Sequence, residues 1–128
     1  MKLTETILLA RELMERHKLN GWKLKFDESR SHLGLCKYSE KTIYLSILYT
    51  EINDNKVIRN TILHEIAHAL AGSRNGHNRI WRTIAKSIGC TGERCTSGAH
   101  NGGRYAEEYK LEWRLNKNIY NENGNLIT

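Results

Sequence analysis

The stretch VIRNTILHEIAHALAGSRNGHNRIWRTIAKSIG, residues Val57–Gly89, carries the pattern that decides the fold. At its centre is HEIAH, in which His64 and His68 are four residues apart. On an α-helix these two positions lie about 40° apart around the axis, so both imidazoles can reach one metal ion. Glu65 lies on the neighbouring flank, where its carboxylate can reach a water on that metal without being a ligand. The pattern therefore predicts a metal site on a helix.

A catalytic zinc ion takes three protein ligands and keeps its fourth position for water or substrate. Residues 66–92 contain no aspartate or glutamate, and beyond His68 their one histidine is His77. A second helix is expected from His77 or Asn78 to Ile88, because apolar residues recur on the face of His77 at three- and four-residue steps. These residues are Ile80, Trp81, Ile84 and Ile88. Packing of that face on the first helix would bring His77 to the metal. We predict one zinc ion held by His64, His68 and His77, with Glu65 as the general base.

The first of these helices is expected to be buried. Asp54 can cap its start, Gly72 ends it, and apolar residues surround nearly its whole circumference. Burial of two histidines and a glutamate would be strongly destabilising unless something satisfied them. A bound metal explains why these polar side chains occur in an apolar helix.

The preceding residues predict a helix and a small antiparallel sheet. Apolar periodicity predicts a helix at 4–19, and alternation predicts strands at 22–26, 33–38 and 42–46, the last two joined by a turn at 39–41. Gly34 suits a bulge or a close approach of the backbone to a neighbour. Cys36 is interpreted as a small buried side chain, and His32 as a surface residue. The predicted fold class is α+β, with an N-terminal helix, a small sheet, the HExxH helix and a second helix that supplies a metal ligand.

Length and composition describe one ordinary soluble domain. The chain has 128 residues, of which 27% are charged and 39% hydrophobic. No run approaches the ~18 apolar residues of a membrane helix, and the apolar cluster at 7–10 is too short for a signal peptide. The cysteines Cys36, Cys90 and Cys95 are an odd, sparse set that suits a reducing compartment. A cytoplasmic location, no membrane association and, by default, a monomer are expected.

The positive charge is concentrated after the HEIAH helix. The net charge is +6, and residues 74–118 hold nine Lys or Arg against four Asp or Glu. Arg79, Arg82 and Lys86 are spaced at three and four residues, which places them in one stripe of the second helix. Such a stripe fits contact with nucleic acid, and it equally fits an exposed face that only meets solvent.

The C-terminal third gives weaker signals. Cys90, Cys95 and His100 have a poor spacing for a second zinc site, and two free thiols in a loop are the competing interpretation. Alternation at 109–115 predicts a strand, and the asparagine-rich residues 116–128 are expected to be a tail. The domain is therefore predicted to span 1–115, with a core at 1–90 and a divergent part at 91–115.

Across His64–Cys90 the chain resembles the SprT-like metalloprotease family, whose signature joins HExxH to a later G-H-x-x-x-W. Gly76, His77 and Trp81 match that signature, and LGLCKYSEKTIYLS at Leu33–Ser46 is similar to the family's short hairpin. The resemblance implies a zincin-like fold with His64, His68 and His77 as ligands and Glu65 as general base. Members similar to Spartan cleave proteins crosslinked to DNA. Many members carry a C-terminal zinc ribbon with paired CxxC motifs, and no CxxC occurs in this chain.

Three functions follow as hypotheses. The first is a zinc endopeptidase that acts on nucleic-acid-associated or DNA-crosslinked protein, with DNA as a possible partner. The second is a zinc peptidase with an unrelated protein substrate. The third is a binding or regulatory protein with a structural zinc, against which Glu65 argues because a structural site needs no base. Tyr38, Tyr44, Tyr49 or an arginine near His77 could supply an oxyanion donor.

Overall fold

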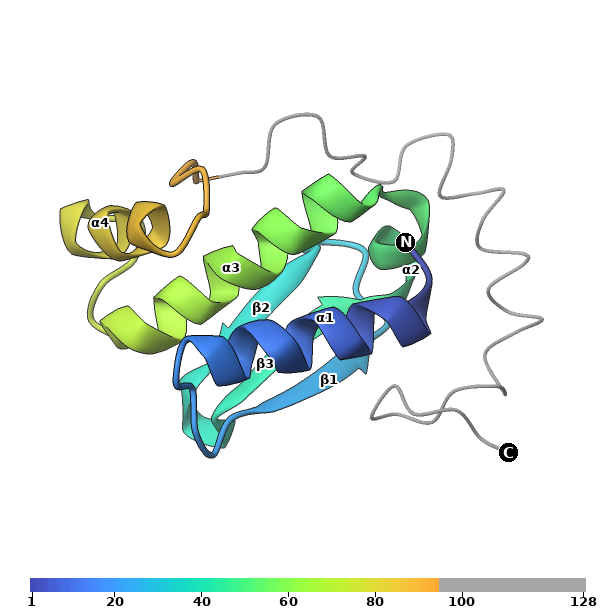
Figure 1. The fold of residues 1–128 in the computed structure, drawn as a ribbon, viewed down its shortest axis with the longest axis horizontal. Helices are drawn as coiled ribbons and strands as arrows, with labels where there is room; N and C mark the ends of the chain where they lie inside the picture. The colour runs from blue at the N-terminus through green and yellow to red at the C-terminus, as the bar shows by residue number, and fades with distance from the viewer. Residues whose placement is uncertain (95–128) are drawn as a thin grey trace.

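The chain folds around a buried helix that lies beside a three-stranded sheet. A computed structural model describes residues 1–94. The described elements, in order, are α1 (Leu3–Arg16), β1 (Lys23–Asp27), β2 (Gly34–Lys37), the 3-10 helix η1 (Tyr38–Glu40), β3 (Thr42–Ser46), α2 (Ile47–Ile52), α3 (Asn55–Ala71) and α4 (Arg79–Ser87). Figure 1 shows α3 between α1 and α4, with β2 running alongside it. The predicted strand at 109–115, the tail, Cys95 and His100 lie outside the described residues.

The sheet is mixed, with strand order β1-β3-β2. The predicted hairpin is confirmed, because β2 and β3 pair antiparallel and put Cys36 opposite Ile43. The prediction of a wholly antiparallel sheet is wrong, because β1 pairs parallel with β3 and puts Phe26 opposite Leu45. The chain leaves β1, forms β2 at the far edge and returns through η1 into the middle position. β3 therefore runs in the same direction as β1.

The helices differ from the predicted ranges mainly at their ends. α1 stops at Arg16, three residues early, because Lys18 takes the left-handed region with φ 57° and the Leu19 amide donates to the Met14 carbonyl. α2 was not predicted at all, and it begins where the Ser46 hydroxyl accepts a hydrogen bond from the Tyr49 amide. This short helix redirects the chain from β3 into α3.

The core confirms the prediction that the HEIAH helix is central. Ile58, Ile62 and Ile66 of α3 have no exposed surface, and Ile43 and Leu45 of β3 are equally buried. α1 packs against both α3 and β1, while α4 packs against α3. In the part of the chain that the structure describes, no helix is both long enough and apolar enough to cross a bilayer. The sheet and α1 therefore hold α3 from one side and leave its histidine-bearing side to α4.

Candidate metal centre

Three imidazoles converge between α3 and α4. The Nε2 atom of His77 lies 3.0 Å from Nε2 of His64 and 3.1 Å from Nε2 of His68. One ligand atom from each residue can be chosen so that all three lie within 4.8 Å of one another. A tetrahedral zinc ion with bonds of about 2.0–2.1 Å spaces its ligands roughly 3.3 Å apart. The spacing of the three nitrogens therefore fits a single small cation.

The local sequence explains how each histidine reaches this point. The Asp54 carboxylate accepts from the Val57 amide at 2.9 Å and starts α3, which sets His64 and His68 on one face. Gly72 ends α3 with φ 92°, a value that favours glycine. His77 precedes Asn78, whose side-chain oxygen accepts from the Trp81 amide at 3.1 Å and caps α4. His77 thus lies just before the second helix and is fixed by its cap.

Trp81 contacts all three imidazoles. Its side chain has no exposed surface, and its ring stacks on His68 with centroids 5.1 Å apart and planes at 24°. The centroid separations are 4.6 Å to His64 and 4.7 Å to His77, and the indole N–H donates to the His64 carbonyl at 3.3 Å. The prediction that Ile80 shares this inward face is wrong, because its side chain is 56% exposed. Trp81 therefore forms the contact between α4 and the three rings.

The three imidazoles are held in the neutral form that a metal ligand needs. Burial lowers the pKa of His64 to about 3 and that of His68 to about 4, with a further contribution from the neighbouring rings. Burial followed by the charge of Arg94 lowers the pKa of His77. A hydrogen bond to the Glu93 backbone raises the pKa of His64, and one to the Asn75 backbone raises the pKa of His68, but burial outweighs both. Around neutral pH, the three ring nitrogens are therefore available to a metal ion.

Glu65 is a buried carboxyl group beside the imidazoles. Its side chain is 6% exposed, and burial raises its pKa to about 8. No residue among 1–94 forms a hydrogen bond or ion pair with its carboxyl group. Its oxygens are not among the fully enclosed polar atoms without a partner in the described residues, and Glu65 lines the cleft, so water or a ligand in the cleft can reach the carboxyl group. This arrangement is typical of a functional group rather than of one retained for stability.

The backbone of β2 closes one side of Glu65. A Cβ atom added at Gly34 would lie 3.1 Å from Cγ and 3.1 Å from Oε2 of Glu65, and 2.9 Å from Cγ2 of Thr61. The predicted close approach of the backbone at Gly34 is therefore confirmed. Only a residue without a side chain lets this strand lie so close to the carboxylate.

A cleft of about 740 Å³ opens over the three imidazoles and Glu65. Its other described lining residues are Arg30, Ser31, His32, Leu33, Gly34, Leu35, Cys36, Tyr38, Tyr49, Thr61, Ser73, Asn75, Gly76 and Arg94. Several of these residues were not predicted to belong to the site. Cys36 was expected to be buried but is only partly so, and His32, expected at the surface, lines the cleft while its Nε2 lies 2.8 Å from Asp27. The alternation of side chains along the strand could have predicted that Cys36 faces the cleft. No local sequence pattern indicates that His32 lines it.

The tyrosines proposed as oxyanion donors have different surroundings. The Tyr44 hydroxyl donates to Glu40 at 2.7 Å and is not part of the cleft. Tyr49 lines the cleft, and its hydroxyl donates to the Arg30 carbonyl. Tyr38 also lines it, with its ring packed edge-on against Trp22 at 6.3 Å and its pKa raised by burial to about 12. Its hydroxyl lies within hydrogen-bonding reach of the Cys36 thiol, another lining residue, and among the three tyrosines it is the candidate donor to a substrate.

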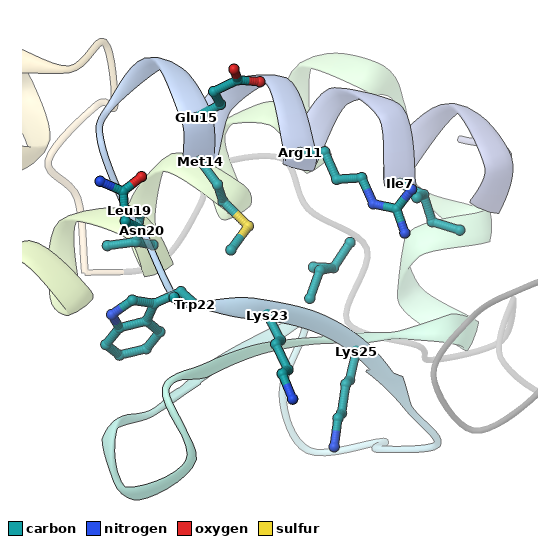
Figure 2. A pocket seen from close by; sticks show the side chains of 11 residues that line it. Ile7, Arg11, Met14, Glu15, Leu19, Asn20, Trp22, Lys23 and Lys25 are labelled. Atoms are coloured by element: carbon teal, nitrogen blue, oxygen red, sulfur yellow. The ribbon is translucent and has the colours of Figure 1, made fainter.

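A second cavity, of about 580 Å³, lies between α1 and β1 and is lined by none of the predicted site residues (Figure 2). Arg11 and Met14 point from α1 towards β1, whereas Lys23 and Lys25 point away from α1 (Figure 2). Its cationic groups therefore do not converge on one point, and we assign no ligand to it.

The basic stripe of the second helix is exposed. Arg79, Arg82 and Lys86 are all solvent-accessible on α4, and none of them lines the cleft. α4 contains no acidic residue, and none of the three cations forms an ion pair with a described residue. Within the described part of the chain, nothing neutralises these three charges.

Comparison with known proteins fits these observations. The sequence profile of the SprT-like family matches residues 3–101. No curated protein sequence matches the chain. Among solved structures, the fold is similar to the crystal structure of the metallopeptidase zymogen of Methanocaldococcus jannaschii jannalysin, with a TM-score of 0.57 and 14% identity over 91% of this chain and 98% of that one. That identity shows a likeness of fold, which is α+β and zincin-like. The family profile covers well over half of the chain, and the chain therefore belongs to the SprT-like family.

Proposed function

We propose that this protein is a zinc-dependent endopeptidase that acts on nucleic-acid-associated or DNA-crosslinked proteins. The observation that carries the peptidase part is the buried Glu65 carboxyl, which has no partner among the described residues and lies beside three neutral imidazoles. Family membership and a structural neighbour described as a metallopeptidase support the same activity. His64, His68 and His77 are the proposed ligands of one zinc ion.

The proposed chemistry divides between the ion and Glu65. Zinc held by the three Nε2 atoms would polarise a peptide carbonyl and acidify the attacking water. The Glu65 carboxylate accepts the proton of that water at an oxygen atom and then delivers it to the leaving amine. The burial that raises the pKa of Glu65 makes its carboxylate a stronger base than an exposed glutamate. Tyr38, with a phenol that stays protonated to about pH 12, is the proposed additional donor to the oxyanion.

The edge strand supports an extended protein substrate. Among residues 1–94, β2 is an edge strand that pairs with β3, and its residues Gly34, Leu35 and Cys36 line the cleft. Its free main-chain groups can pair with a peptide in the manner of an added strand. Recognition of this kind depends on backbone and gives little sequence selectivity.

The nucleic-acid part of the proposal rests on α4. Arg79, Arg82 and Lys86 form an exposed stripe on the helix that directly follows His77. Phosphate contacts there would bring protein bound to DNA close to the cleft. If the stripe only meets solvent, the second hypothesis, a peptidase with an unrelated protein substrate, takes precedence.

The test is proteolysis of a DNA-binding protein, with and without DNA and with and without a chelator. We expect cleavage that DNA stimulates and the chelator abolishes. The Glu65→Gln variant should keep its metal and fold but lose activity by at least ~100-fold, because an amide cannot accept the proton. Equal cleavage by this variant would remove Glu65 as the base. Cleavage that is indifferent to DNA would refute the nucleic-acid part alone.

A further inference from the structure

The walls of the cleft carry an unbalanced set of charges. Among the described lining residues, Arg30 and Arg94 are basic, and Glu65 is the one acidic residue. Glu65 is buried, whereas both arginines are exposed. Neither guanidinium forms an ion pair or hydrogen bond with a described residue. A peptide that enters the cleft therefore meets positive charge on its walls, and residues 1–94 provide no anion that pairs with these two arginines.

The loop that carries Arg30 is fixed at both ends. The Ser46 hydroxyl donates to the Ser29 carbonyl at 2.7 Å, and the Tyr49 hydroxyl donates to the carbonyl of Arg30 itself. His32, two residues later, lies 2.8 Å from the Asp27 carboxylate. These contacts place the Arg30 backbone at the rim of the cleft and limit where its guanidinium can reach.

The acidic groups of this loop do not neutralise Arg30. One oxygen of Asp27 contacts His32 at 2.8 Å, and the other accepts from the Ser29 amide at 3.1 Å. Glu28 is exposed and does not line the cleft. Within residues 1–94, no acidic side chain neutralises the Arg30 guanidinium.

Arg94 extends the positive charge to the metal end of the cleft. It comes from the segment after α4 and lines the cleft together with His64, His68 and His77. Two cations from segments far apart in the sequence therefore border the same cleft. Charges arranged in this way raise the local concentration of anionic substrates and disfavour cationic ones.

We propose that the cleft selects peptides with an acidic side chain close to the scissile bond, and that Arg30 and Arg94 determine this specificity. The inference rests on the proposed peptidase function and names its substrate class. A nucleic-acid backbone is the less suitable ligand here, because it needs cations in a row along an open surface. Arg79, Arg82 and Lys86 provide such a row elsewhere, on α4.

The experiment uses sets of three fluorogenic peptides that differ only in Glu, Gln or Lys at one position. One set is made for each of the two positions on either side of the scissile bond. For the zinc-loaded protein we expect kcat/KM to follow Glu over Gln over Lys at one or more positions, with Glu about 5- to 20-fold above Lys. That range corresponds to about 1–2 kcal/mol for one or two partly exposed charge pairs. The preference should weaken strongly at 0.5 M salt.

Charge reversal gives the decisive comparison. Arg30→Glu should reverse the order of the Glu and Lys peptides, while Lys56→Glu, an equal charge change at an exposed residue away from the cleft, should leave it intact. Loss of activity on all three peptides by the same factor would show that Arg30 is only structural. Equal rates for the three peptides with the unaltered protein would overturn the proposal directly.

Binding separates this inference from the peptidase proposal. The same peptides, labelled for fluorescence anisotropy, are titrated into zinc-loaded Glu65→Gln protein. Tighter binding of the Glu peptide supports charge selection even if the unaltered protein cleaves no peptide. Such a lack of cleavage would refute the peptidase function alone. Cleavage without any charge preference in either assay would refute the selection alone. Displacement of the peptide by a single-stranded oligonucleotide, relieved by Arg30→Glu, would assign the cleft cations to phosphate and overturn the proposal.

Discussion

Replacement of Gly34 by alanine tests whether the edge strand positions the Glu65 carboxylate. The new Cβ would lie 2.9 Å from Cγ2 of Thr61, where ordinary contact begins at about 3.4 Å. Thr61 cannot rotate away without loss, because its χ1 is restricted and its hydroxyl donates to the Val57 carbonyl at 2.9 Å. The Cβ would also lie 3.1 Å from Cγ and from Oε2 of Glu65. Either β2 retreats by about half an ångström or the carboxylate is pushed aside.

The expected magnitudes follow from these overlaps. Insertion of one methyl group into a packed contact costs about 1–3 kcal/mol, which should lower the urea midpoint of unfolding. A displacement of ~1 Å at a reacting group costs roughly 100-fold in rate, so a few tenths of an ångström at Glu65 should reduce kcat by about 5- to 20-fold. The metal content should be unchanged, because the atoms nearest to the new Cβ belong to Thr61 and Glu65 and not to a histidine.

Gly76→Ala is the matched control. Gly76 lines the same cleft and precedes His77, but a Cβ there would meet no atom within 4 Å. We expect its kcat, metal content and urea midpoint to remain close to those of the unaltered protein. If Gly34→Ala keeps full kcat and stability, the strand yields freely and the positioning argument fails. If it loses metal instead of kcat, the strand acts on the ligands and not on Glu65.

Three further predictions address the metal, the protonation state and the basic stripe. His77→Ala should lower bound zinc, measured by elemental analysis, by more than half, and full occupancy would remove His77 from the ligand set. In metal-free protein, the raised pKa of Glu65 makes its neutral form the stable one in the folded state, whereas the unfolded chain ionises near pH 4.5. The resulting contribution to the free energy of unfolding is fully present below pH 4.5 and is lost as the pH rises to about 8, by at most about 4–5 kcal/mol. Urea titrations of the unaltered protein and Glu65→Gln, both metal-free, should diverge over this range, and parallel curves would contradict the assignment. Replacement of Arg79, Arg82 and Lys86 by alanine should flatten the log–log salt dependence of DNA binding by about two, at unchanged zinc content, and an unchanged slope would leave the stripe as a solvent-exposed face.

The convergence of the three histidines was predictable because most of its geometry is encoded over short distances. The spacing of His64 and His68 sets two side chains on one helical face whatever surrounds the helix. The position of His77 followed from the apolar periodicity around Trp81, although Ile80 in the same pattern proved to be exposed. The role of Trp81 as a contact to all three rings could not be read in this way. That role depends on the angle between α3 and α4, which local periodicity does not specify.

The sheet was less predictable for a physical reason. Alternation of apolar and polar residues indicates which side of a strand is buried, but it does not identify the neighbouring strand or its direction. The residues of β1 fit a parallel or an antiparallel neighbour equally well, and they do not specify the order β1-β3-β2. Arg30 and His32 reach the cleft through contacts with Tyr49 and Asp27. Such contacts join segments that no local pattern connects.

α4 joins the proposed chemistry to the proposed recruitment. It is nine residues long, and Trp81 and Ala85 are its buried residues. Its packing on α3 depends mainly on Trp81, whose ring lies against the three imidazoles. The His77 side chain adds a second attachment when a metal ion joins it to His64 and His68. The ion proposed for catalysis would therefore also fix the distance between the cleft and the basic stripe on α4. Loss of the metal would remove the reaction and, by loosening α4, the alignment of a nucleic-acid-bound substrate with the cleft.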